Sequence, residues 1–219
     1  MKAYILGASA QGRVVLGILK AQYPGREIEF IDDNQKLWGS KINETNVAGG
    51  FDHLLKQDTS QFELIIALGH PFIRKKIADR AVDNCITLLN AIHPSSVIAE
   101  TAEIGQGNTI CAGSVINANA KICDNVVINT STIVEHDCFI KDYVSLSSGA
   151  ILGGRVMINE FAFISSGANV CKNLTVGKSS VVGAGCVVIH DVPDNVLVIG
   201  VPGKIKEQIY DNFDWQRVL

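Results

Sequence analysis

The second half of the chain carries a hydrophobic pattern that repeats every six residues. The position two residues before each of these ladder residues is mostly small, from Ser96 to Cys186. A period of six fits neither the 3.6-residue repeat of a helix nor the two-residue repeat of a strand. We therefore predict a solenoid with three hexapeptides in each turn of about 18 residues, and about five turns over 98–188. Sixteen consecutive ladder positions hold Ile, Leu or Val, namely Ile98, Ile104, Ile110, Ile116, Ile122, Ile128, Val134, Ile140, Leu146, Leu152, Ile158, Ile164, Val170, Val176, Val182 and Val188.

The first half instead alternates strand-like and helix-like segments. This order is that of the mononucleotide-binding half of a doubly wound α/β sheet, so we predict a Rossmann-like domain over 1–92. The β-helix domain follows over 93–203, and we expect a helical C-terminal tail over 204–219. A Gly-rich turn, Gly7–Gly12, separates the first strand from the first helix. The predicted strands are Ala3–Leu6, Ile28–Asp33, Phe62–His70 and Ile86–Ile92, and the predicted helices are Arg13–Gln22 and Ile73–Val82.

Composition excludes several classes of function. The 219 residues are 47% hydrophobic and 19% charged, with a net charge of −3, so we expect no nucleic-acid partner. No apolar run approaches the roughly 20 residues of a membrane span, and no signal peptide is evident, so we expect no membrane insertion. The cysteines lack CxxC spacing, which indicates reduced thiols in a cytoplasmic protein and no metal site. They are Cys85, Cys111, Cys123, Cys138, Cys171 and Cys186.

Three adjacent ionisable residues, Glu135, His136 and Asp137, interrupt the apolar ladder between Val134 and Ile140. Histidine suits general-base catalysis because its unperturbed pKa lies near working pH, and a carboxylate can orient its ring. Neighbours on a strand point to opposite faces, so the pairing of His136 with Asp137 requires a bend. The alternative is a solvated surface histidine among acids.

The order of motifs along the chain resembles that of the left-handed β-helix (hexapeptide-repeat) acyltransferases. Within them, the chain is most similar to the branch that N-acetylates nucleotide-linked amino sugars, with its sialic-acid O-acetyltransferase-like relatives. The resemblance implies left-handed coiling, a homotrimer with active sites between neighbouring β-helices, acetyl-CoA as donor, and a UDP-, dTDP- or GDP-sugar in the N-terminal domain. It rests on the hexapeptides together with GASAQGRVV, IDD, ALGHPFIRKKI, INTSTIVEHDCFI and GVPGK.

The resemblance implies roles for residues around the charged trio. His136 would be the base that accepts the amine proton, Asp137 its carboxylate partner, and Glu135 a site residue without a settled role. Asn129 would lie near the acceptor amine, although an Asn at a turn is the alternative. Cys138 occupies a small-residue position, and we expect it to be inert packing.

The resemblance also implies contacts to acetyl-CoA. The backbone N–H of Gly154 would bind the thioester oxygen, while Ser166 and Ala184 would line the path of the pantetheine. Lys204, in the GVPGK segment, would meet a CoA phosphate, with a solvated lysine as the alternative. Many relatives carry a second histidine nine residues after the base; here it is Ser145, which can hydrogen-bond to the donor but cannot act as acid or base.

The candidate nucleotide site lies in the first domain. A glycine-started turn at a helix N-terminus can offer amides to a pyrophosphate, and acids at a strand's carboxyl end can bind a base or ribose. A solvated turn with a helix cap is the alternative. Relatives often have His where this chain has Gln11, which leaves the exact sugar open. The candidates are Gly7, Ser9, Gln11, Gly12, Asp32 and Asp33, and we expect Arg74, Lys75 and Lys76 to be surface charges.

These observations predict an acetyl-CoA-dependent N-acetyltransferase acting on a nucleotide-linked amino sugar in bacterial surface glycan synthesis, such as lipopolysaccharide O-antigen. Two alternatives remain open at this point. One is a sugar O-acetyltransferase of the sialic-acid type, and the other is a non-catalytic trimer that binds nucleotide sugars.

Overall fold

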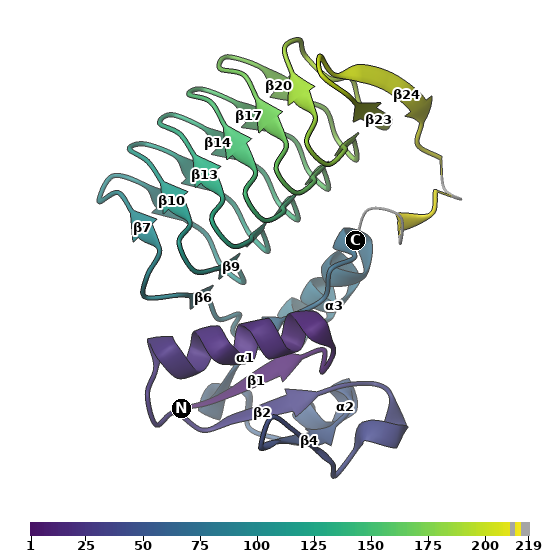
Figure 1. Ribbon diagram of the computed structural model, residues 1–219. Helices are drawn as coiled ribbons and strands as arrows, with labels where there is room; N and C mark the ends of the chain where they lie inside the picture. The colour runs from purple at the N-terminus through teal and green to yellow at the C-terminus, as the bar shows by residue number, and fades with distance from the viewer. Residues whose placement is uncertain (211–212, 216–219) are drawn as a thin grey trace.

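The structure, a computed structural model, describes residues 1–210 and 213–215 of the chain. It consists of an α/β domain and a β-helix that rises from it (Figure 1). The α/β domain has a five-stranded sheet in the order β3-β4-β2-β1-β5, parallel except for the β3–β4 hairpin. The predicted alternation is confirmed. The elements are β1 (Lys2–Leu6), α1 (Ala10–Gln22), β2 (Ile28–Ile31), η1 (Gln35–Leu37), β3 (Lys41–Ile42), β4 (Thr45–Gly49), α2 (Phe51–Leu54), η2 (Thr59–Gln61), β5 (Phe62–Ile66) and α3 (Pro71–Asp83).

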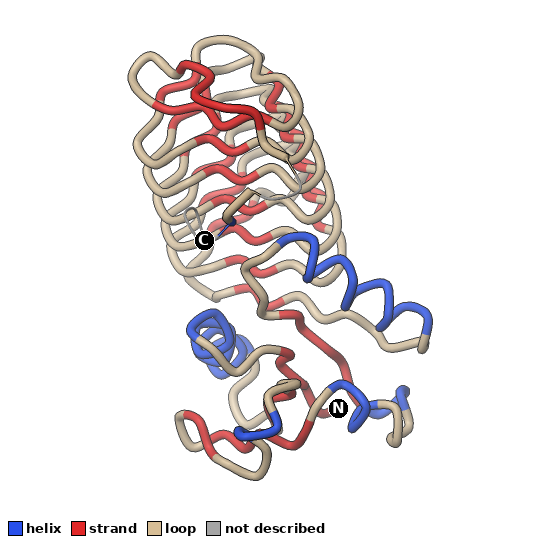
Figure 2. Tube along the Cα trace, turned by 90° about the vertical axis from the view of Figure 1, so that its right-hand side faces the viewer, coloured by secondary structure: helices blue, strands red, loops and turns tan. Residues whose placement is uncertain are grey.

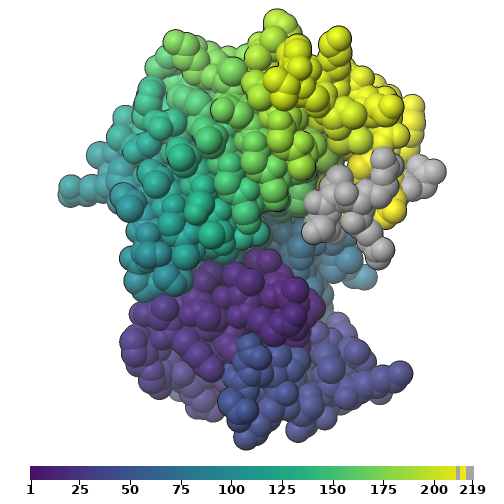
Figure 3. Space-filling model, viewed as in Figure 1, coloured from purple at the N-terminus to yellow at the C-terminus, as the bar shows by residue number. Residues whose placement is uncertain are grey.

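Both faces of this sheet are covered. Val15 and Leu19 of α1 pack on one face, and Ala78 and Ala81 of α3 pack on the other together with α2. The core on the α1 side also contains Ala91 and Cys111 of the β-helix. The two parts of the chain therefore share buried contacts, and Figure 3 shows the N-terminal domain packed directly against the lower turns.

The predicted solenoid is present, and each ladder residue is the second residue of a two-residue strand. Backbone N–H groups donate to carbonyls of the next turn, as in Phe139 to Val156 at 2.9 Å. Parallel ladders stack along the axis (Figure 2). The strands are β7 (Val97–Ile98), β8 (Glu103–Ile104), β9 (Thr109–Ile110), β10 (Val115–Ile116), β11 (Lys121–Ile122), β12 (Val127–Ile128), β13 (Ile133–Val134), β14 (Phe139–Ile140), β15 (Ser145–Leu146), β16 (Ile151–Leu152), β17 (Met157–Ile158), β18 (Phe163–Ile164), β19 (Asn169–Val170), β20 (Thr175–Val176), β21 (Val181–Val182) and β22 (Val187–Val188).

The strands form three flat faces. Face 1 contains β7, β10, β13, β16, β19 and β22, and face 2 contains β8, β11, β14, β17 and β20. Face 3 contains β9, β12, β15, β18 and β21, and it is the face against which the N-terminal domain and the tail pack. The ladder residues fill the interior, where burying each aliphatic side chain contributes ~1.5–3 kcal/mol.

A left-handed backbone conformation recurs along the corners of the β-helix. The residue three positions after a ladder residue has positive φ at fourteen consecutive corners, from Gly107 to Gly185. Most of these residues are Gly, Asn or Ser, which tolerate this conformation, but Tyr143, Arg155 and Phe161 are also among them. The bend required between His136 and Asp137 is therefore Asp137 itself, with φ of 58°.

Three expectations from the sequence are wrong: one strand, the start of the tail and the exposure of Arg74. The segment Ile86–Ile92 is not one strand: Leu88 forms an isolated bridge with Leu64 of β5, and β6 (Ala91–Ile92) pairs with β9 as the first rung of the β-helix. The helical tail is wrong for 204–208, because β24 (Lys204–Gln208) pairs antiparallel with β23 (Val196–Ile199). This strand pairs with an otherwise open strand edge; residues 211–212 and 216–219 of the predicted tail lie outside the described residues. Arg74 is not a surface charge but fully buried.

Candidate active site

The charged trio lies at the corner between faces 1 and 2, hereafter corner 1–2, where β13 ends and β14 has not begun. The Nδ1 atom of His136 lies 2.7 Å from Oδ2 of Asp137. Because a carboxylate can only accept, Nδ1 carries the proton of this bond, and the neutral form of the ring therefore has its lone pair on Nε2. Both side chains are close to half exposed, at 48% and 43%, so the imidazole faces open space. The predicted contact between the two residues is present.

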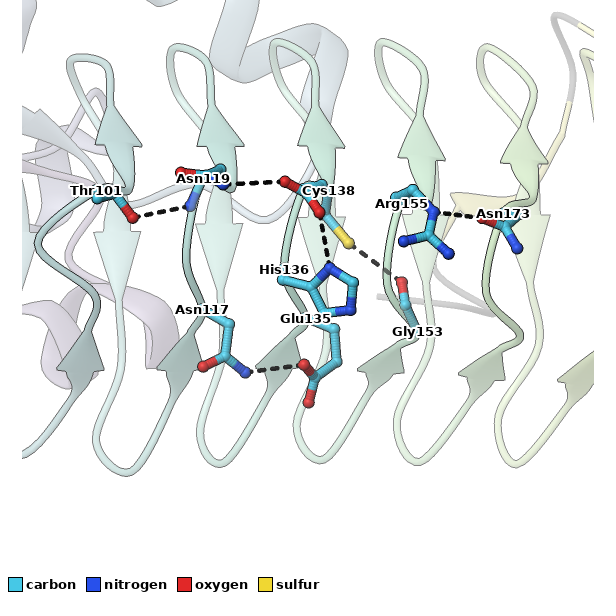
Figure 4. A network of polar contacts seen from close by, with 10 residues as sticks. Thr101, Asn117, Asn119, Glu135, His136, Cys138, Gly153, Arg155 and Asn173 are labelled. Carbon is cyan, nitrogen blue, oxygen red and sulfur yellow. Dashed lines mark hydrogen bonds and ion pairs between the residues drawn. The ribbon is translucent and has the colours of Figure 1, made fainter.

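Asparagines one turn below hold both carboxylates. Asn119 donates from Nδ2 to Oδ1 of Asp137 at 3.1 Å, and Asn117 donates to Glu135 at 3.0 Å. Each pair is 18 residues apart, which is one turn of the β-helix. Figure 4 shows these side chains along corner 1–2 across successive turns. Sequence reasoning missed both asparagines, although subtracting one 18-residue turn from each acid locates them.

The hydrogen bonds have an electrostatic consequence for Asp137. Donation first from His136 and then from Asn119 lowers the pKa of the Asp137 carboxyl below its usual value. The nearby thiol of Cys138 behaves in the opposite way, because burial raises its pKa. Cys138 is 1% exposed and donates to the carbonyl of Gly153, which agrees with the expected packing role.

Gly154 lies against the imidazole. A Cβ atom at this position would sit 2.6 Å from Nε2 and 2.7 Å from Cε1 of His136. Any side chain would therefore displace the ring, so glycine is required here for the position of His136. Among the described residues, none accepts a hydrogen bond from the Gly154 N–H.

Three further candidates, one for the acceptor amine and two for acetyl-CoA, lie at a different corner. Asn129, Ser166 and Ala184 stand at the corner between faces 3 and 1, hereafter corner 3–1, and not beside His136 of the same chain. Asn129 Oδ1 accepts the N–H of Thr130 at 2.8 Å, while Ser166 and Ala184 are exposed. Face 1 therefore has a column of candidate residues along each edge: one at corner 1–2 around His136, and one at corner 3–1 around Asn129.

Ser145 and Lys204 lie apart from both columns. Ser145 is on face 3, 5% exposed, and its Oγ accepts a hydrogen bond from Arg74 at 3.1 Å. This leaves it little surface for acetyl-CoA. Lys204 is exposed at the start of β24.

The candidate nucleotide turn follows β1 as predicted. Gly7 has φ of 106°, and a Cβ there would lie 2.8 Å from the carbonyl oxygen of Ala67. A Cβ on Gly12 would overlap the carbonyl oxygen of Gly7, so helix α1 begins in close contact with the turn. Ser9 is exposed at the N-terminus of α1 and makes no capping bond, while Nε2 of Gln11 is buried without a partner among the described residues.

The two acids after β2 differ in role. Asp32 accepts the N–H of Ala8 on Oδ2 and the N–H of Asn34 on Oδ1, each at 2.9 Å, so one oxygen holds the glycine turn and the other holds its own loop after β2. Asp33 accepts the N–H of Phe51 at 3.0 Å. It also lines a cavity of about 390 Å³, whose wall includes the half-exposed ring of Trp38. Trp38 was not identified from the sequence, because a lone tryptophan in a loop gives no pattern.

Two further classes of site are not found in the described part of the chain. No group of three or more His, Cys, Asp or Glu residues there could hold a metal ion. None of the helices described is both long and apolar enough to cross a membrane.

Solved structures of known proteins resemble this chain over nearly its whole length. Residues 2–81 match the PglD N-terminal domain family. The GDP-perosamine N-acetyltransferase of Caulobacter crescentus, solved as a histidine-to-alanine variant with CoA and GDP-perosamine, has a TM-score of 0.89 and 34% identity. That alignment covers 95% of this chain and 98% of the other.

Two other acetyltransferases also resemble this chain. The acetyltransferase domain of PglB from Neisseria gonorrhoeae, in complex with acetyl coenzyme A, has a TM-score of 0.88 and 33% identity, covering 94% of this chain and 98% of that one. The UDP-N-acetylbacillosamine N-acetyltransferase of Bacillus subtilis is 36% identical over 112 residues, 49% of this chain and 50% of its own. The alignments with curated acetyltransferases span only 17% to 50% of those proteins.

Proposed function

This chain belongs to the left-handed β-helix, hexapeptide-repeat acyltransferases of the sugar N-acetyltransferase branch, and from that premise we propose its reaction. The acetyl group of acetyl-CoA is transferred to the amine of a nucleotide-linked amino sugar. The observation that carries the proposal is the bond from His136 Nδ1 to Asp137, which leaves Nε2 free to accept a proton at an exposed corner.

The reaction needs no enzyme nucleophile. The amine nitrogen attacks the thioester carbonyl, and its proton passes to Nε2 of His136. Asp137, kept ionised by its lowered pKa, stabilises the resulting imidazolium. Breaking the C–S bond then releases the amide and CoA, whose sulfur takes up a proton. Cys138 takes no part, since its thiol is buried and bonded to Gly153.

Gly154 serves the same step in two ways. Its lack of a side chain makes room for the imidazole, as the 2.6 Å approach to Nε2 requires. Its N–H has no acceptor among the described residues, and it is the donor we assign to the thioester oxygen as negative charge develops.

Acetyl-CoA and a second copy of the chain meet on face 1. The outward residues of this face include Val97, Ile133 and Ile151, an apolar stripe between corners 1–2 and 3–1. By contrast, face 2 carries a Glu103–Lys121 ion pair. We propose that face 1 forms the interface of a homotrimer, which would bring corner 3–1 of one subunit, with Asn129, Ser166 and Ala184, to corner 1–2 of another.

The trimer has a direct test. Ile133→Asp should dissociate it, because a charge would be buried in the apolar stripe, whereas Lys121→Asp on face 2 should leave the mass unchanged. Light scattering after size-exclusion chromatography measures the mass. Equal masses for both variants would exclude face 1 as the interface.

The nucleotide sugar binds the N-terminal domain in this proposal. Gly7, Ser9 and Gly12 shape the turn for the diphosphate, and Gln11 contributes a buried amide. Asp33 and the adjoining cavity receive the base, while Asp32 holds the turn. The relatives' names support a nucleotide-linked amino sugar as the substrate, and we place the reaction in bacterial surface glycan synthesis. The six free thiols agree with a reducing compartment.

One assay separates the proposal from its alternatives. Wild-type protein is incubated with acetyl-CoA and UDP-, dTDP- or GDP-linked amino sugars, or with the hydroxyl analogue of each, and CoA release is measured. Turnover of an amine supports the proposal, and faster turnover of a hydroxyl would favour an O-acetyltransferase. Ligand binding without CoA release from any acceptor would show a non-catalytic binding protein.

A further inference from the structure

Arg74 of helix α3 is fully buried, although it begins a run of three basic residues. Its neighbour Lys75 stays near the surface and forms an ion pair with Asp79, and Lys76 is exposed. Only the first of the three cations has therefore been taken out of water. A buried charge is costly unless its hydrogen-bonding capacity is met, so this position calls for a specific reason.

The guanidinium donates only to neutral oxygens among the described residues. On the N-terminal side, Nη1 donates to the carbonyls of Leu68 and Gly69 at 2.9 and 3.0 Å. On the β-helix side, Nε donates to Asn125 O at 2.9 Å, and Nη2 donates to Tyr143 O at 2.8 Å and Ser145 Oγ at 3.1 Å. Burial lowers the pKa of Arg74 to about 10, so it remains charged at neutral pH.

The acceptors on the β-helix side mark the two ends of one turn. Asn125 and Tyr143 are successive left-handed residues at the corner between faces 2 and 3, hereafter corner 2–3. The turn that runs between them carries Glu135, His136 and Asp137. Arg74 thus contacts the same turn as the proposed base, from the opposite side.

The acceptors on the N-terminal side belong to a loop that forms a wall of the nucleotide turn. Leu68 and Gly69 follow β5, and the carbonyl of Ala67 is the atom closest to the position of a Cβ on Gly7. The side chain of Leu68 is the next closest. One planar side chain therefore joins the loop beside the nucleotide turn to the turn that holds His136.

We infer that Arg74 is a positioning residue, which fixes the height of the nucleotide-binding domain along the β-helix so that the acceptor amine arrives level with His136. The inference rests on the proposed function. Rotation about an axis parallel to the β-helix leaves this height unchanged, so Arg74 sets the level of the amine whether the sugar reaches His136 of its own subunit or of a neighbour. Lysine cannot replace arginine here, because one ammonium cannot reach acceptors on both domains.

The test compares Arg74→Lys with wild type, with Lys76→Met as the matched control on the same helix. Steady-state rates give kcat for the nucleotide-linked amino sugar, and calorimetry gives Kd for that sugar and for acetyl-CoA separately. For Arg74→Lys we expect kcat to fall about 100-fold, because a misplacement near 1 Å has that effect, while each Kd stays within about threefold. Lys76→Met should match wild type in all three quantities.

Other outcomes have distinct meanings. A kcat within about threefold of wild type, or a parallel loss of kcat and both affinities, overturns the positioning role. Should Arg74→Lys unfold at assay temperature, Ser145→Ala removes one acceptor and keeps the charge. It should lower kcat by a smaller factor at unchanged Kd, and no change in kcat would overturn the inference. A wild-type protein that acetylates no amino sugar overturns the proposed function, and this inference with it.

Discussion

Corner 1–2 and corner 2–3 of the turn that carries His136 share a backbone conformation and differ in what covers them. Asp137 and Tyr143 have φ of 58° and 61°, six residues apart. The Asp137 side chain is 43% exposed beside an open imidazole, whereas Tyr143 stacks on Phe161 at 5.3 Å and its carbonyl binds Arg74. Identical backbone geometry thus supports a reactive corner and a structural corner. The neighbouring elements decide which is which.

The largest expected effect comes from a substitution that removes the chemistry of corner 1–2 and leaves corner 2–3 intact. His136→Ala should lower kcat for the amino-sugar acceptor by about 10³-fold, because it removes the Nε2 atom that accepts the amine proton. The thermal midpoint should stay the same, since the side chain is half exposed. A thiol-reactive dye that detects released CoA measures the rate.

The control is His93→Ala, which removes an imidazole bonded to Ser95 away from that corner. Its rate should equal that of wild type. A His136→Ala variant that retains full kcat would remove the catalytic role of this corner.

A second change adds one methyl group to the same corner. Gly154→Ala should lower kcat by about 100-fold, since the new Cβ must move the imidazole from its place near Asp137. The matched control is Gly17→Ala in α1, where nothing lies within 4 Å of an added Cβ. The control should keep its rate and gain about 0.5–1 kcal/mol of stability, as glycine to alanine does in a helix. Equal rates for both variants would contradict the assigned contact.

The third change tests the structural corner by stability instead of rate. Phe161→Asn should lower the free energy of unfolding by about 2–3 kcal/mol, because it removes a ring stacked on both Tyr143 and Phe72. Asparagine tolerates the left-handed conformation, so the loss reports the ring. Urea denaturation measures it.

Arg155→Asn is the control at the preceding left-handed position of the same turn, on the exposed corner 1–2. Its free energy of unfolding should change by less than about 1 kcal/mol, because the hydrogen bond it loses, from Arg155 Nε to Asn173 Oδ1, is exposed to solvent. Comparable losses at both positions would show that the covering elements do not distinguish the corners.

The smallest expected effect is the pH dependence of stability at Asp137. Its folded-state pKa is lowered, so its contribution to stability is present above the unfolded value of roughly 3.9 and is lost as pH falls through the folded value. The difference in thermal midpoint between wild type and Asp137→Asn should therefore be constant near neutrality and shrink below about pH 4. Its size stays small because the carboxylate is exposed to solvent. A difference that grows on acidification would contradict the direction of the shift.

The fold was largely predictable because its physical cause is local and periodic. Each ladder residue must point inward, so the six-residue period located every two-residue strand from Ile98 to Val188. A third register, three positions after each ladder residue, would also have located the left-handed corners through its Gly, Asn and Ser residues. Asp137 belongs to that register, which explains how it turns back toward His136.

The candidate site was only partly predictable, because much of it depends on contacts between distant segments. The neighbours His136 and Asp137 could be paired from sequence, and Asn119 follows from one 18-residue step. Arg74 could not be recognised, since its burial depends on the way α3 packs against face 3. The strand β24 was also missed, because its partner β23 becomes available only once the β-helix ends.

Arg74 attaches the nucleotide domain to the turn between Asn125 and Tyr143. The distance from that domain to His136 is therefore independent of the total length of the β-helix. The distance from the nucleotide domain to His136 is fixed by turns at or below that point. Turns above Tyr143 add only to the extent of the β-helix toward β22. Whole 18-residue units could therefore be gained or lost at that end during evolution, or by design, and the reach from sugar to base would stay constant.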